Sequence, residues 1–264
     1  MRPGSPWLRP WQRLHVTRRC LSTKVPRLSA VHQGNAFEER SLALLHKTMS
    51  MSLKRVGGKA DGGIDLLGWW WLPAPSNSLP DHNSSNTRRR IRVIGQCKAE
   101  KRKTGPKYVR ELEGVLFRFL TGSLGIHNSP DPDFVEFTKP YTSHPPTIAL
   151  LMSESEFTKS SILRANSSPI PFFLLHLPAI VNPHATEADD LGNLSMALCN
   201  PALCGTDGLL QGRMELRWER HEFGAGGRPA LWWGNQRLRN WTPDLELVLP
   251  KPDDTLREDP PGLA

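Results

Sequence analysis

The spacing of hydrophobic and polar positions switches between a helical and an extended period along the chain. In residues 34–51 the apolar side chains occupy one broad arc at helical spacing, which predicts an amphipathic helix. Residues 64–71 and 91–98 are short runs of bulky apolar side chains, which predicts two buried strands. Residues 104–120 return to the helical period, with Pro106 suited to the first turn. This part of the chain is therefore expected to form helix, strand, strand and helix.

A similar alternation continues to Pro178. Residues 147–152 and 170–177 are apolar and predict two more strands. Between them, Ser153 and Glu156 have the spacing of a capping box, which predicts a helix running to about Arg164. The resulting element order favours an α/β fold in which a mixed sheet is flanked by helices.

The pattern also predicts how the chain is divided. Two polar, proline-containing stretches, residues 72–88 and 122–146, are expected to be long loop inserts in the sheet. We expect an α/β domain over residues 30–178, a C-terminal extension packed on it over 179–250, and a flexible tail over 251–264. Within the extension, a helical piece near 191–203 and strands at 214–220 and 231–233 are predicted.

Residues 1–29 have the composition of a targeting segment. The formal net charge of the chain is +8, and residues 1–30 contain seven basic side chains and no acid. Trp7, Leu8, Trp11 and Leu14 would share one side of a helix, as in a mitochondrial transit peptide. This predicts import into the mitochondrial matrix, with cleavage ahead of Ser22. The alternative is a basic arm that binds nucleic acid.

Two classes of protein are disfavoured by the composition. The longest apolar run, residues 170–181, is short and interrupted by prolines, so no integral membrane segment is expected. The cysteines do not follow the spacing of a zinc site, and we interpret them as buried thiols.

Residues 57–103 contain the candidate chemistry. Asp65 stands at the start of one predicted strand, and Gln96 and Lys98 end its partner on one face, with Cys97 on the other. Glu38 falls within the apolar arc of the first helix, where a carboxylate is costly unless it is paired or binds a metal. The alternative is that Glu38 is stabilised by a nearby helix N-terminus.

These side chains are of the types that phosphodiester hydrolysis requires. Asp65, Glu38 and Gln96 offer oxygen ligands for Mg²⁺. Lys98 could orient a water molecule or stabilise the charge that develops on the phosphate. We therefore predict a catalytic Mg²⁺ site formed by these four residues.

A basic segment surrounds the second strand and predicts a polyanionic partner. We expect it to form a local patch beside the candidate site and to bind DNA, with RNA as the alternative ligand. The residues predicted to contact nucleic acid are Arg88, Arg89, Arg90, Lys101, Arg102, Lys103 and Lys107. The competing interpretation is a solvated, charged loop.

Three short motifs, GNAFEER, GGKADGGIDL and QCK, occur in an order that resembles the Mrr-type branch of the PD-(D/E)xK restriction-endonuclease superfamily. In that branch Q-x-K replaces E-x-K. The resemblance covers residues 34–120 and implies a restriction-endonuclease-like sheet, Mg²⁺-dependent cleavage, and site roles for Glu38, Asp65, Gln96 and Lys98.

Longer segments resemble a second family. The segments that carry this resemblance are QCKAEKRKTGPKYVRELEG, LLMSESEFTKSSILRA and the late LWWGN. They resemble the fungal mitochondrial family called required for respiratory growth protein 7. This resemblance implies a mitochondrial protein needed for respiration through upkeep of the mitochondrial genome.

Three functions remain open at this point. The first is a Mg²⁺-dependent nuclease that acts on DNA in mitochondria. A homodimer of such a nuclease would allow both strands to be cut. Alternatively, the chain is a non-catalytic nucleic-acid-binding factor on a nuclease-like fold, or a matrix assembly protein. Metal binding separates the first function from the third.

Overall fold

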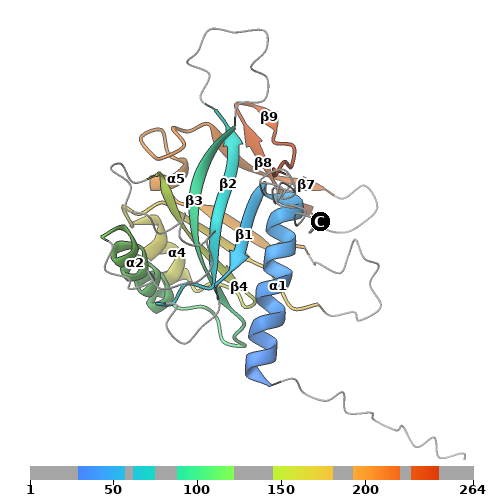
Figure 1. The fold of residues 1–264 in the computed structure, drawn as a ribbon, viewed down its shortest axis with the longest axis vertical. Coiled ribbons are helices and arrows are strands. Elements are labelled where there is room, and N and C mark those ends of the chain that lie inside the picture. Colours follow the sequence, from blue (N-terminus) through green and yellow to red (C-terminus); the bar gives the residue numbers. More distant parts are fainter. Residues whose placement is uncertain are drawn as a thin grey trace, which may run out of the picture.

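The main body of the protein is a mixed sheet flanked by helices (Figure 1). The computed structural model describes residues 29–56, 62–74, 88–121, 145–180, 193–220 and 227–243. The helices are α1 (Ala30–Thr48), α2 (Pro106–Leu120), α4 (Lys159–Asn166) and α5 (Pro201–Cys204). The strands are β1 (Met51–Arg55), β2 (Leu66–Pro73), β3 (Arg88–Lys98), β4 (Thr147–Ser153), β5 (Phe172–His176), β6 (Met196–Cys199), β7 (Met214–Arg220), β8 (Gly227–Trp233) and β9 (Gln236–Arg237). The α/β class that the sequence predicts is confirmed.

The larger sheet has six strands in the order β1-β2-β3-β4-β5-β6. The strands β1, β2 and β3 are antiparallel, β3, β4 and β5 run parallel, and β6 is antiparallel to β5. Parallel strands bring their carboxyl ends to one edge, and Lys98, Ser153 and His176 are therefore in register there. The smaller sheet contains β7, β8 and β9.

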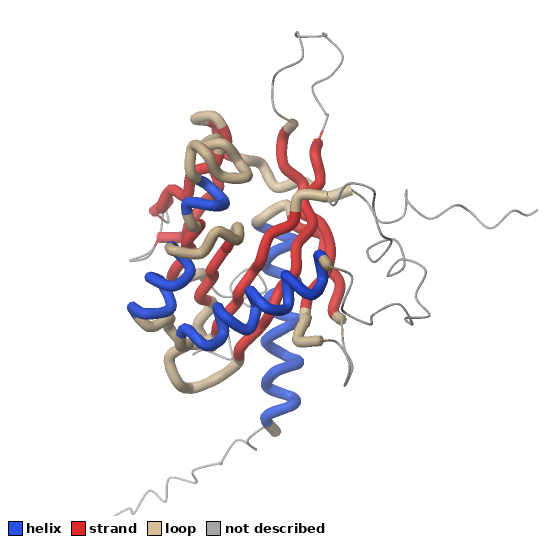
Figure 2. The backbone as a smooth tube through the Cα atoms, turned by 90° about the vertical axis from the view of Figure 1, so that its left-hand side faces the viewer, coloured by secondary structure: helices blue, strands red, loops and turns tan. Residues whose placement is uncertain are grey.

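The two faces of the large sheet are buried against different elements. One face packs against α1 in a core that includes Phe37, Leu45, Trp70 and Phe173. The other packs against α2 and α4 in a second core, and Figure 2 shows α2 crossing in front of the strands with α1 behind them. Because side chains alternate along β3, Gln96 and Lys98 belong to the α2 face.

The first difference from the prediction concerns the end of the first helix. The sequence predicts a helix through residue 51, but α1 ends at Thr48 and residues 51–55 form β1. Ser50 adopts a φ of 57°, a left-handed conformation that reverses the chain without a glycine. Met51 is then paired with Trp70 on β2. The helical spacing of the apolar residues continues by chance to Met51, the buried first residue of this edge strand.

The predicted capping box at Ser153 is wrong. Ser153 is the last residue of β4, and its hydroxyl group lies 2.5 Å from the hydroxyl of Thr104. The helix α4 begins instead after Thr158, whose hydroxyl accepts the backbone N–H of Ser161 at 3.2 Å. Burial in a parallel strand prevented Ser153 from acting as a helix cap.

The region after Pro178 matches the prediction in part. The predicted helical piece at 191–203 is extended strand β6 followed by the single turn α5. The predicted strands at 214–220 and 231–233 are confirmed as β7 and β8. Leu203, Leu210 and Met214 join the core on the α1 face. The predicted transit peptide, most of both predicted loop inserts and the predicted tail lie outside the described residues, and the domain boundaries stay predictions.

Asn200 connects this later region to the main sheet. Its side chain is fully buried, and its Oδ1 accepts the backbone N–H groups of Phe172 at 2.9 Å and Leu203 at 3.1 Å. Its Nδ2 donates to the carbonyls of Ala165 and Ile170 at 2.9 and 2.8 Å. All of its hydrogen-bonding capacity is used, so β5, the end of α4 and α5 are held by one amide.

We predict that Asn200→Ala lowers the free energy of unfolding by about 3 kcal/mol, because several buried backbone groups lose their partner. Urea unfolding followed by circular dichroism measures the change. Asn193→Ala, at an exposed position, serves as the control. Equal unfolding midpoints for the two variants would show that the amide has no structural role.

Candidate functional site

Asp65 is fixed at the point where three strands meet. Its backbone N–H donates to the carbonyl of Gly95 at 3.0 Å, and its carbonyl accepts the N–H of Val56 at 2.9 Å. Its carboxylate Oδ2 accepts the backbone N–H of Cys97 at 2.6 Å. The acid is therefore held against the end of β3, directly between Gln96 and Lys98 along the chain.

Gln96 is buried, and only one of its two amide groups has a hydrogen-bond partner among the described residues. Its side chain is 5% exposed, and Nε2 donates to the carbonyl of Gly63 at 3.3 Å. Gly63 has a φ of 89°, a conformation that suits glycine and shapes this turn. The other amide atom, Oε1, is buried and has no hydrogen-bond partner among the described residues. An unsatisfied buried acceptor next to a carboxylate is suited to a cation.

Lys98 follows on the same face and lies against the first turn of α2. Its Nζ is 4.9 Å from the centre of the Tyr108 ring. The Tyr108 hydroxyl donates to Oε1 of Glu100. Burial and this hydrogen bond raise the pKa of the Tyr108 hydroxyl, so it stays protonated at neutral pH. The sequence analysis did not single out Tyr108, although a polar hydroxyl on the apolar side of a predicted helix was a signal that could have marked it.

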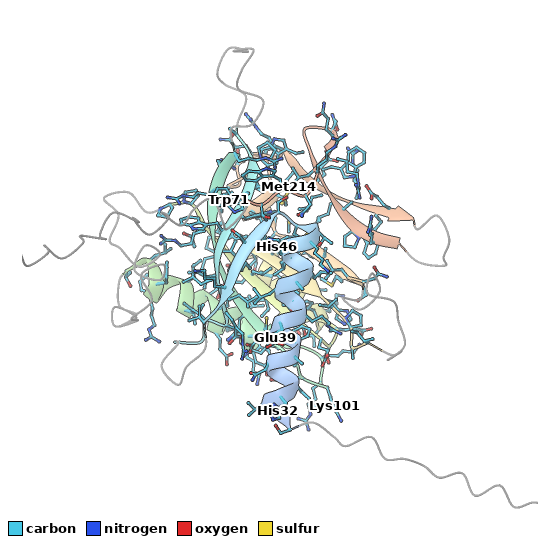
Figure 3. All side chains as sticks on the ribbon, turned by 45° about the vertical axis from the view of Figure 1, so that its right-hand side comes forward. His32, Glu39, His46, Trp71, Lys101 and Met214 are labelled. Atoms are coloured by element: carbon cyan, nitrogen blue, oxygen red, sulfur yellow. The ribbon has the colours of Figure 1, made fainter. Side chains whose placement is uncertain are left out.

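Glu38 is paired with an arginine. Its Oε2 forms an ion pair with Nε of Arg55 on β1, and Arg55 also lies 3.6 Å from Glu39. The side chain of Glu38 is 18% exposed, whereas that of Glu39, labelled in Figure 3, is 70% exposed. The helix begins at Ala30, so the predicted alternative of stabilisation by the helix N-terminus is wrong. Arg55 provides the compensation that a partly buried carboxylate requires.

Cys97 points to the α1 face, as the alternation predicts. Burial is the main reason that the pKa of its thiol is raised, and the carboxylates of Asp65 and Glu38 raise it further. The thiol therefore stays protonated and is unsuited to nucleophilic chemistry. Arg55, the partner of Glu38, is paired with Leu66, the residue after Asp65, so Glu38 lies toward the same end of the sheet as Asp65.

The predicted single basic patch is divided in two. Lys101, Arg102 and Lys103 follow Lys98, whereas residues 88–90 stand at the opposite end of β3. Arg90 and Lys98 are eight positions apart on β3, or about 26 Å at the rise of an extended strand. Trp71 and Lys101 mark the two ends in Figure 3.

The members of the predicted patch also differ in their surroundings. Arg89 points to the α1 face, where it donates to the carbonyl of Leu209 at 3.4 Å and lies over Trp233. Near the site, Lys103 forms an exposed ion pair with Glu156 at 2.7 Å. Lys107 lies over the ring of Tyr108. The expectation that all of these residues lie beside the site was wrong, because β3 already begins at Arg88 and its length separates residues 88–90 from Lys98.

The side-chain oxygen atoms at this end of β3 are of the type that magnesium binds. Among the described residues there is no group of three or more His, Cys, Asp or Glu side chains suited to a metal. Magnesium, however, often keeps several waters and binds through one or two carboxylates. Asp65 and the buried Oε1 of Gln96 provide such a partial set, while Glu38 is engaged by Arg55.

No helix within the described parts of the chain has the length and apolar character needed to cross a bilayer.

We predict that Gln96→Met leaves the free energy of unfolding unchanged or raises it by about 1 kcal/mol, because the buried orphan oxygen is removed. Chemical denaturation measures this effect, with Gln236→Met at an exposed position as the control. A loss of more than about 2 kcal/mol would mean that the amide is a structural group with satisfied bonds.

Comparisons with known proteins find similarity to one family model and to two proteins named as mitochondrial. Residues 29–130 match the family model described as required for respiratory growth protein 7. Over 107 residues the chain is 39% identical to an uncharacterized mitochondrial protein of Schizosaccharomyces pombe, covering 40% of this chain and 38% of that protein. Over 183 residues it is 25% identical to the mitochondrial required for respiratory growth protein 7 of Vanderwaltozyma polyspora, covering 58% of this chain and 66% of that protein.

The chain thus matches less than two thirds of the length of either relative. No solved structure matches it. Glu38, Asp65, Gln96 and Lys98 all lie within the segment that is similar to the required for respiratory growth protein 7 family.

Proposed function

We propose that this chain is a mitochondrial, Mg²⁺-dependent nuclease that cleaves DNA in maintenance of the mitochondrial genome, on which respiratory growth depends. The observation that carries the proposal is the end of β3, where the N–H of Cys97 fixes Asp65. The buried Oε1 of Gln96 beside it has no hydrogen-bond partner in the described part of the chain. Lys98 adds a cation on the same face. Acid, amide and amine thus converge as hydrolysis of a phosphodiester requires.

In this proposal Asp65 and Gln96 would hold the magnesium ion. When bound, the ion supplies charge neutralisation at the phosphate and a more acidic water molecule. Asp65 is already oriented by its hydrogen bond, so little reorganisation is needed for binding. Glu38 could join this set only by leaving Arg55.

Lys98 would act on the phosphate or on the attacking water. Its ammonium group lies over the Tyr108 ring, a cation–π contact that holds it beside the end of β3. The nearby exposed Lys101 and Arg102 would neutralise neighbouring phosphates. Cleavage of both strands of a duplex would require two such sites, which a homodimer would provide.

The proposed location rests on the relatives and on the leader. Both relatives carry the word mitochondrial in their names. The arginine-rich, acid-free residues 1–29 have the composition of a transit peptide. Because mitochondrial DNA lies in the matrix, the proposal places the protein there.

One observation favours a second function. The Glu38–Arg55 ion pair neutralises one of the two predicted carboxylate ligands, as expected if this fold binds nucleic acid without a metal. In that case the chain is a non-catalytic factor that maintains the mitochondrial genome. Arg55 would then stabilise the fold through a permanent ion pair with Glu38, which would not be released to bind a metal.

We predict that full-length protein cleaves plasmid or branched DNA with Mg²⁺ and not with a chelator. Asp65→Asn and Lys98→Met should each lower the cleavage rate by about 100-fold or more, since each removes a group that acts at the phosphate. Lys159→Ala, an exposed lysine on α4, should retain wild-type activity.

Cleavage that is unaffected by both site variants would come from a contaminant and would contradict the assignment. An absence of cleavage, together with salt-sensitive DNA binding that both variants retain, would favour the non-catalytic function.

A further inference from the structure

A second surface lies on β2 and β3, at the end away from Asp65. Three cross-strand pairs share one face there, and each pair joins a β2 residue to an arginine on β3. The pairs are Trp69–Arg92, Trp71–Arg90 and Pro73–Arg88. Figure 2 shows these strands extending beyond the part of the sheet that α2 covers. The surface is therefore built by strand register and lies on the same face as Gln96 and Lys98.

Cations and aromatic rings alternate on this surface. The Arg90 guanidinium lies 4.4 Å from the centre of the Trp69 ring. The Arg88 guanidinium lies 5.4 Å from Trp241, whose ring meets Trp71 edge to face at 5.8 Å. We call the residues Trp71, Arg88, Arg90 and Trp241 the Arg–Trp surface. The rings hold the guanidinium groups in place and leave Arg90 exposed to solvent.

The charge of Arg88 has no ion-pair partner among the described residues. Burial lowers the pKa of its guanidinium. The Nη1 of Arg88 is buried and has no hydrogen-bond partner within the described ranges. A phosphate would provide both the opposite charge and the missing acceptor.

The chemistry of the surface favours unpaired nucleotides over a duplex. Tryptophan rings and guanidinium planes stack on exposed bases, and each stacked base contributes about 1–3 kcal/mol to binding. In a duplex these base faces are already stacked on their neighbours. Arg90 and Gln96 are six positions apart on β3, which corresponds to about 20 Å along an extended strand. The surface is thus distinct from the candidate catalytic site.

We propose that the Arg–Trp surface binds single-stranded nucleic acid, with arginines on its phosphates and tryptophans under its bases. This inference deepens the proposed function and rests on it only in taking nucleic acid as the ligand. A substrate with both an unpaired strand and a duplex could then contact the surface and the site together. The preferred class would be branched or frayed DNA.

The test measures binding separately from cleavage. Full-length protein is titrated, in the presence of a chelator, into labelled oligo-dT and oligo-U, and into a blunt duplex with the same number of nucleotides. Fluorescence anisotropy gives the dissociation constants. Arg90→Glu is compared with Arg228→Glu, which reverses an exposed arginine on β8. Trp71→Ala is compared with Trp71→Phe, which retains a stacking ring, and thermal melting checks that each variant is folded.

We expect the single strands to bind about 10-fold or more tightly than the duplex, with Arg90→Glu weakening that binding by about 10-fold. Trp71→Ala should weaken it and Trp71→Phe should restore most of it, while Arg228→Glu should have little effect. Similar affinity for oligo-dT and oligo-U also supports the proposal, because both expose their bases.

Equal affinity for duplex and single strand would overturn the proposal. Equal effects of Arg90→Glu and Arg228→Glu on the affinity for single strands would also overturn it. Binding would then reflect only general attraction between opposite charges. Because no cleavage is measured, these results are independent of the nuclease. Selective binding of single strands without any Mg²⁺-dependent cleavage would contradict the proposed function and support this inference. Cleavage without selective binding would support the proposed function and contradict this inference.

Discussion

The hydrogen bond from the backbone N–H of Cys97 to the carboxylate of Asp65 is the contact on which the candidate site depends. It joins the residue before β2 to the end of β3, and the backbone of Asp65 also bonds to Gly95 and Val56. The pairing of the three strands thereby fixes the position of the Asp65 carboxylate. The side-chain alternation of β3 then brings Gln96 and Lys98 to the α2 face beside it.

Two buried amides show how this site differs from the rest of the core. Asn200 uses both ends of its amide on backbone groups and connects three elements. Gln96 is nearly as buried, yet its Oε1 has no partner within the described parts of the chain. A core built for stability alone would favour an apolar side chain at that position. The contrast is a physical reason to assign Gln96 to function.

The sequence predicted most of the sheet and missed the environment of one site residue. Strands β2, β3 and β4 followed from bulky apolar runs, because buried strands need no polar face. Strand β1 was missed because the chain reverses at Ser50, which adopts a left-handed conformation without the glycine that usually marks one. That error hid Arg55, the partner of Glu38. Residues 88–90 were placed beside Lys98 because the extension of β3 could not be read from charge spacing.

The most direct test of the account is whether this end of β3 binds one divalent ion. Manganese prefers the same oxygen ligands as magnesium and is detected by electron paramagnetic resonance. Titration of the full-length chain should show one bound Mn²⁺ that Mg²⁺ displaces, with an affinity at least about 10-fold weaker in Asp65→Asn. Glu39→Gln, which changes an exposed carboxylate on α1, should leave binding unchanged. Binding that is absent from the wild type, or equally strong in Asp65→Asn, would contradict the account.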